Sequence, residues 1–154
     1  MNNNIHILIG SDHGGFEMKE LIKDFLMANN TLTIIDIGTY TKDSCDYPDI
    51  AQKLCTKLLE NKSDNLSMYF GILICGTGIG ISISANKIPG IRCSLCYNEY
   101  TSKMARQHNN ANVLALGART TNVEMAIKII FIFLTTNFEG GRHERRVNKI
   151  EKKI

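Results

Sequence analysis

Reactive side chains follow two of the apolar runs in this sequence. Asp12 and His13 come after the first run, and Cys75 ends the third run, directly before Gly76 and Thr77. A free cysteine thiol titrates at about pH 8.5, so a modest lowering of its pKa makes it a usable base at neutral pH. A buried structural thiol is the alternative. A thiol placed ahead of a glycine turn and a helix N-terminus, whose dipole favours thiolate, favours acid–base chemistry.

The turn from Gly76 to Gly80 contains three glycines and has the character of an anion cradle. Glycines let the backbone approach a ligand closely, and successive amide N–H groups ahead of a helix bind anions. A dinucleotide fingerprint would need a further glycine where Ile81 stands and would follow the first strand, so the spacing speaks against nicotinamide binding. A tight turn without a ligand is the other alternative, but it leaves the thiol beside it unexplained.

Two histidines allow a structural and a functional interpretation. His13 lies in a polar turn beside Asp12 and two glycines, which favours ligand contact over a place in the core. His108 ends a predicted helix, so the topology puts it at the opposite end of the sheet from Cys75. It is either an ordinary cation at a helix C-terminus or part of the site of a neighbouring subunit.

The tail after Gly140 and Gly141 is basic. Arg142 and Arg146 are four residues apart and therefore share one face of a helix. Arginines so spaced either clamp one phosphate or belong to a solvated surface, and Lys152 and Lys153 fit the solvated surface.

Apolar runs alternate with helix-patterned segments along the whole chain. Five β–α units predict a five-stranded parallel sheet with helices on both faces, that is, a three-layer Rossmann-like α/β fold. Ligands bind beyond the carboxyl ends of such strands, where the sequence also places Tyr47, Gly117 and Arg119. The predicted strands are 5–10, 32–38, 69–75, 90–96 and 112–117, and the predicted helices are 16–27, 47–59, 80–87, 99–107, 122–134 and a final basic helix over 140–154.

Length and composition indicate one cytoplasmic domain. With 154 residues, 44% hydrophobic, the chain suffices for a single domain over 1–154, with a core over about 1–137 and a C-terminal helix over about 140–154. We see no signal peptide and no apolar run of membrane-spanning length. The net charge of +3 does not by itself indicate nucleic acid. Five scattered cysteines do not form a disulfide framework, and Cys93 and Cys96 in one strand are too far apart to bridge and read as buried packing residues.

Several motifs resemble the type B ribose-5-phosphate isomerase family, which also includes the subunits of galactose-6-phosphate isomerase. The match runs in order over nearly the whole chain, so it is more specific than any single motif. One branch of that family places a glutamate where this chain has Ile81, so the resemblance is to the cysteine branch. The motifs are GSDHGGFEMK, DYPDIA, ILICGTGIGISISANKIPGIR, ARQHNNANVLALGAR and FEGGRHERRV.

The resemblance implies a role for each matching position. Cys75 takes the proton next to the carbonyl, Thr77 helps to hold the enediolate, and His108 helps to open the furanose ring. The implied substrate-binding residues are Asp12, His13, Tyr47, Gly76, Gly78, Ile79, Gly80, Asn109, Arg119, Arg142 and Arg146, the last three for the phosphate.

The implied reaction interconverts ribose 5-phosphate and ribulose 5-phosphate, in the non-oxidative pentose phosphate pathway, and needs no cofactor and no metal. Family members are homodimers or homotetramers with a shared active site, which agrees with the position expected for His108. Three alternatives stay open: an isomerase of a hexose 6-phosphate of the allose or galactose type, a non-catalytic sugar-phosphate-binding protein, and nucleic-acid binding through the basic tail. We expect neither a membrane nor a nucleic acid as partner.

Overall fold

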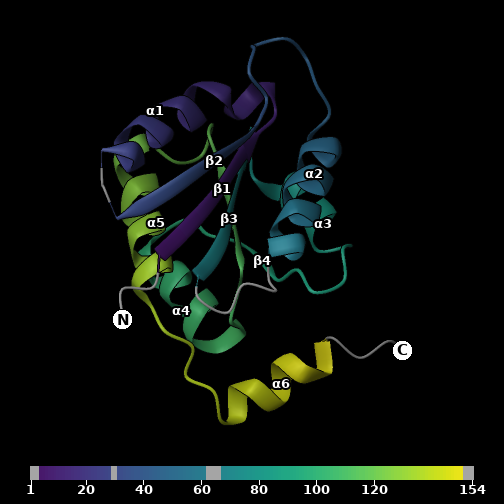
Figure 1. Cartoon of the computed structure of the whole chain (residues 1–154), viewed down its shortest axis with the longest axis vertical. Coiled ribbons are helices and arrows are strands. Elements are labelled where there is room, and N and C mark those ends of the chain that lie inside the picture. The colour runs from purple at the N-terminus through teal and green to yellow at the C-terminus, as the bar shows by residue number, and fades with distance from the viewer. Residues whose placement is uncertain (1–3, 29–30, 62–66, 151–154) are drawn as a thin grey trace.

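Five parallel strands form the centre of the molecule, as the computed structural model of the chain shows (Figure 1). The structure describes residues 4–28, 31–61 and 67–150. Along the sheet the strands follow the order β2-β1-β3-β5-β4, and every neighbouring pair is parallel. The expected fold class is confirmed. The strands are β1 (Asn4–Ser11), β2 (Leu32–Gly38), β3 (Ser67–Cys75), β4 (Cys93–Leu95) and β5 (Val113–Gly117).

Helices cover both faces of the sheet and bury two apolar clusters. Helices α1 (Phe16–Met27), α4 (Glu99–Asn109) and α5 (Val123–Thr135) pack on one face, and α2 (Tyr47–Glu60) and α3 (Ile79–Ala85) pack on the other. Strand β3 lies between them and alternates, so that Ile74 joins the first cluster and Leu73 and Cys75 join the second. This two-sided burial explains why β3 is continuously apolar. None of the helices in the described ranges is long and apolar enough to cross a bilayer.

Element ends differ from the prediction mainly around β4. The predicted strand 90–96 is wrong at its start, because β4 begins only at Cys93. The Asn112 side chain accepts a hydrogen bond from the Arg92 amide (2.8 Å) and donates one to the Gly90 carbonyl (2.9 Å). These bonds take residues 90–92 out of the hydrogen-bond ladder of the sheet. Helix α3 ends at Ala85 instead of Lys87. Cys93 and Cys96 are buried and free, as expected.

The last helix, α6 (Arg142–Ile150), lies at the end of the sheet where the strands begin, away from the carboxyl ends (Figure 1). Residues 151–154 of the predicted tail helix, including Lys152 and Lys153, lie outside the described residues. On α6, His143 and Val147 are buried, whereas Ile150 is exposed.

Arg106 ties the chain after α5 to the end of α4. Its side chain is buried, and burial lowers the pKa of the guanidinium to about 10. It donates to the carbonyl oxygens of Ala111 (2.5 Å) and Thr136 (3.3 Å), and it lies over the ring of Phe133. The segment that leads into α6 is therefore held against α4, and the amide of Glu139 donates to the Gln107 carbonyl at 3.1 Å.

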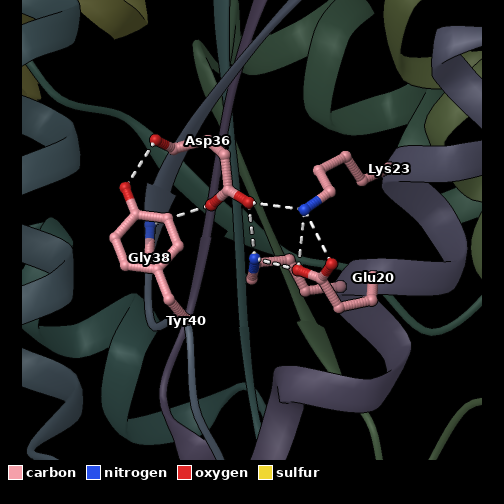
Figure 2. Close-up of polar contacts among 6 residues, drawn as sticks. Glu20, Lys23, Asp36, Gly38 and Tyr40 are labelled. Carbon is pink, nitrogen blue, oxygen red and sulfur yellow. Dashed lines mark hydrogen bonds and ion pairs between the residues drawn. The ribbon is translucent and has the colours of Figure 1, made fainter.

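A network of charged side chains holds α1 against the end of β2 (Figure 2). The Lys19 side chain is fully buried, and its Nζ lies 2.8 Å from Asp36 Oδ2. Lys23 bonds the same carboxylate at 2.8 Å, and Glu20 pairs with both lysines. Burial by itself would raise the pKa of Asp36, but hydrogen bonds from Lys19, Lys23 and the Gly38 amide outweigh it and hold that pKa below its ordinary value of 3.8. The network fixes the start of the 39–46 loop, which leads into α2.

Asp36→Asn should lower the free energy of unfolding by about 3 kcal/mol at pH 7, because it leaves the buried Lys19 ammonium with less compensating charge. The exposed pair of Glu17 with Lys42 supplies the matched control, and Glu17→Gln should change the free energy of unfolding much less than Asp36→Asn does. Urea unfolding measures both values. Because the folded-state pKa of Asp36 is depressed, its contribution is present above pH 3.8 and is lost as the pH falls through the folded-state value, so the deficit of Asp36→Asn should shrink in acid. Equal costs for the two variants would show that the network is no stronger than a surface pair.

Candidate active site

The turn after β3 brings a thiol and backbone amides together. Cys75 is the last residue of β3 and is 4% exposed. The amide of Gly78 donates to its Sγ at 3.1 Å, and the amide of Ile79 donates to Thr77 Oγ1 at 3.3 Å. Gly78 has a φ of 77°, a left-handed conformation that glycine adopts without strain. The turn therefore directs a backbone donor at the sulfur.

The turn after β1 packs directly on the turn after β3. The amide of Asp12 donates to the Ile74 carbonyl at 3.2 Å, and the Asp12 carboxylate accepts from the Gly15 amide at 3.1 Å. A Cβ on Gly15 would lie 2.6 Å from the Ile74 oxygen, so only glycine permits this approach. The chain thus requires a glycine here to bring Asp12 close to Cys75.

His13 and Tyr47 reach the same edge from two segments. His13 is exposed, and its Nδ1 accepts from the Cys45 amide at 3.2 Å, which joins it to the loop before α2. Tyr47 starts α2, and a Cβ on Gly80 would lie 2.6 Å from its ring. The Tyr47 ring therefore rests on the glycine turn, at the edge of the sheet where the sequence placed Tyr47.

Arg119 closes the other side of this edge. Its amide donates to the Gly76 carbonyl at 2.9 Å, and a Cβ on Gly76 would lie 3.1 Å from its Nη1. Arg119 also lines a cleft of about 590 Å³ together with His13, Gly14 and Lys42. Cys75 is not among the lining residues of that cleft. Glu17, which pairs with Lys42, also lines the cleft, so Arg119 is the cation there that no carboxylate is seen to pair with among the contacts described.

The remaining predicted residues lie at the opposite end of the molecule. His108 and Asn109 are in the last turn of α4, and Arg142 and Arg146 are exposed on α6, which packs against α4. The structure thus divides the predicted site residues into two groups. The Cys75 group comprises Asp12, His13, Tyr47, Cys75, Gly76, Thr77, Gly78, Ile79, Gly80 and Arg119, and the His108 group comprises His108, Asn109, Arg142 and Arg146.

Sequence reasoning missed His143, which joins the His108 group. Its ring stacks on the ring of His108, with centroids 4.1 Å apart and planes at 3°. His143 and Val147 are four residues apart and both buried, so the helical spacing of the tail carried a signal that a histidine replaces an apolar residue on the inner face.

His108, Glu139 and His143 offer potential metal-ligand atoms within 4.8 Å of one another. In-plane lone pairs of two parallel rings lie in separate planes and do not converge on one ion. As arranged here, the three side chains therefore do not form a metal centre, and the described residues contain no other group of this kind that we identify.

Residues 7–150 match the family model described as Ribose/Galactose Isomerase. This chain belongs to that family. The resemblance seen in the sequence is confirmed, and the match includes both groups of site residues. Ribose-5-phosphate isomerase B of Escherichia coli is 42% identical over 144 residues, which cover 94% of this chain and 93% of that protein.

Solved structures of the ribose/galactose isomerase family share the same fold. Ribose 5-phosphate isomerase B of Thermotoga maritima is 46% identical, with a TM-score of 0.89 over 97% of this chain and 99% of that one. The enzyme of Mycoplasma genitalium, solved with bound ribulose-5-phosphate, is 43% identical, with a TM-score of 0.88 over 97% of this chain and 95% of that one. The similarity covers nearly the full length of both chains.

Proposed function

We propose that this chain is an isomerase that interconverts ribose 5-phosphate and ribulose 5-phosphate, with Cys75 as the base. The observation that carries the proposal is the Gly78 amide directed at Cys75 Sγ, at a strand end that also gathers Asp12, Tyr47 and Arg119. A family member of the same fold binds ribulose-5-phosphate, which supports a phosphorylated pentose as substrate. None of the five cysteines forms a disulfide, which supports a location in the reducing cytoplasm.

The chemistry transfers one proton between neighbouring carbons. The Cys75 thiolate takes the proton from C2 of the open-chain aldose, and the electron pair of that C–H bond forms the C1–C2 double bond of a cis-enediolate. The hydroxyl proton of O2 passes to O1 in the intermediate, so return of the carbon-bound proton to C1 leaves a hydroxyl at C1 and the carbonyl at C2, and no electron leaves the substrate. In this mechanism, amides of the Gly76–Gly80 turn and Thr77 stabilise the enediolate oxygens.

The separation of the two groups of residues supports an active site shared between subunits. Cys75 lies at the carboxyl end of β3, whereas His108 lies beyond the other end of the sheet. The five residues of β5 alone span about 16 Å, which is longer than a pentose chain. We therefore propose a homodimer or homotetramer in which the His108 group of one subunit completes the Cys75 group of another, where His108 opens the ring and Asn109, Arg142 and Arg146 bind the substrate.

A coupled assay tests the substrate. Turnover of ribose 5-phosphate by the purified single chain, well above turnover of allose 6-phosphate and galactose 6-phosphate, is the expected result. Preference for a hexose 6-phosphate would move the chain to the alternative isomerase class. Binding without turnover of any of the three sugars would make it a sugar-phosphate-binding protein.

Arg142→Ala should raise KM for ribose 5-phosphate about tenfold and leave kcat within about threefold, because a phosphate contact is made in the ground state and in the transition state alike. Steady-state kinetics measures both constants. Arg145→Gln, an equally exposed cation on α6, controls for the change in net charge and should leave KM as it is. A KM unchanged by Arg142→Ala would remove Arg142 from the phosphate site.

A further inference from the structure

His143 is a buried histidine on α6, where Val147 is also buried and the other residues are exposed. It is 5% exposed, whereas its neighbours Arg142 and Glu144 are exposed. It faces α4, where its ring covers the ring of His108 in a parallel stack. A stacked ring restricts the rotation of its partner, so His143 fixes the orientation of the His108 imidazole.

The same histidine also contacts Arg142. Arg142 Nε donates to His143 Nε2 at 3.4 Å, and Glu139 Oε2 lies 3.5 Å from the same nitrogen. A ring nitrogen carries either a lone pair or a proton. With a lone pair, Nε2 accepts from Arg142, and with a proton it donates to Glu139. Whether Nε2 carries a proton therefore decides which neighbour His143 holds.

The surroundings keep His143 neutral. Burial, His108 on α4, and Arg142 and Arg146 on its own helix lower the pKa of His143 below the ordinary 6.5, and Glu139 opposes them only in part. In the neutral Nδ1–H tautomer, which the contact with Arg142 Nε requires, the lone pair of Nε2 accepts from Arg142. Below the lowered pKa, the imidazolium repels Arg142 and pairs with Glu139.

We propose that His143 is a positioning residue of the His108 group, which orients His108 through the ring stack and Arg142 through its Nε2 lone pair. It does not itself contact the substrate. This inference rests on the proposed function, because it assigns His143 to the two side chains that open the sugar ring and bind the phosphate.

Two variants separate the two contacts. His143→Phe keeps a ring against His108 but removes the acceptor, so KM for ribose 5-phosphate and the Kd of inorganic phosphate should rise about fivefold to tenfold, with kcat within about twofold. His143→Gln keeps an amide acceptor but removes the ring, so kcat should fall about tenfold, with a smaller change in KM. Asn148→Ala, an exposed polar change on the same helix, is the control.

The contrast between the two variants distinguishes a positioning role of His143 from a purely structural one. Thermal unfolding of each protein shows whether it is folded. A purely structural role would lower the unfolding temperature of both variants while leaving KM, kcat and phosphate affinity of the folded fraction unchanged, and that result would overturn the proposal. Equal effects of the two variants on both constants would overturn it as well.

Glu139→Gln supplies a test that leaves His143 in place. Removing the carboxylate that favours the imidazolium lowers the pKa of His143 further, so the acid-side loss of phosphate affinity should begin at a lower pH than in the unaltered protein. Inorganic phosphate itself also titrates, but it does so equally in both experiments, so it does not contribute to the difference between the two pH profiles. Identical pH profiles would exclude His143 as the titrating group.

The phosphate titration also separates the two proposals. Calorimetry with inorganic phosphate needs no turnover, so it reports on Arg142 even in a protein without isomerase activity. Absence of ribose 5-phosphate turnover in the unaltered chain would refute the proposed function. Unchanged phosphate affinity in His143→Phe would refute only the positioning role.

Discussion

Cys75→Ala should lower kcat for ribose 5-phosphate by a factor of about 10³ or more while leaving substrate binding measurable. The thiol is the group that moves the proton in the proposed mechanism, and general base catalysis typically contributes about 10² to 10⁴ in rate. The exchange removes one atom from a side chain that is 4% exposed, so the Gly76–Gly80 turn should keep its shape. Steady-state kinetics gives kcat, and calorimetry with ribose 5-phosphate gives the affinity.

Cys55 offers the matched control. It is a buried, free cysteine in the same apolar cluster as Cys75, and burial raises the pKa of its thiol to about 12. Cys55→Ala should therefore cost stability without loss of kcat. Full activity of Cys75→Ala would refute the base assignment.

Mixing subunits of Cys75→Ala with subunits of a second variant, His108→Ala, tests whether the active site is shared between subunits. Cys75→Ala and His108→Ala should each be inactive alone. In a mixed dimer, one of the two sites combines an intact Cys75 with an intact His108 from the other subunit. Random exchange makes half of the dimers mixed, and each of these has one intact site of two. Activity should therefore return towards a quarter of the unaltered value. No recovery despite proven exchange would place both residues of a site in one subunit.

Gly78→Ala should lower kcat by about 10² and also destabilise the fold. The residue has a φ of 77°, and a Cβ there would lie 2.5 Å from Leu95 Cδ1 and 2.9 Å from the carbonyl carbon of Leu116. The backbone has to move, and the amide that donates to Cys75 Sγ moves with it. Misplacement of a reacting group by about 1 Å typically costs about 10² in rate, and the strained backbone costs about 1 to 3 kcal/mol of stability.

The control is a second glycine with positive φ. Gly90 has a φ of 83° and lies between α3 and β4, away from the thiol. Gly90→Ala should lower the free energy of unfolding similarly but leave kcat unchanged. Comparable loss of kcat in both variants would mean that the effect of Gly78→Ala comes from general instability and not from the donor at Cys75.

The order of strands and helices could be predicted because it depends on local pattern. An apolar run such as 69–75 is buried on both faces of a parallel sheet, and short connections leave few other topologies. The place of Cys75 at a strand end, next to glycines, follows from the same pattern. The length of β4 could not be predicted, because the Asn112 side chain competes with the ladder there.

The sequence by itself determined the fold class, the family and the edge of the sheet where Asp12, Cys75 and Arg119 meet, since periodicity, glycine positions and parallel topology are properties of short segments. The tertiary structure alone decided the rest. It placed a fully buried Lys19 between two carboxylates, set Tyr47 on Gly80, and stacked His143 on His108. Each of these contacts joins segments whose mutual distance depends on how helices pack on the sheet or on one another, and no local pattern encodes that distance.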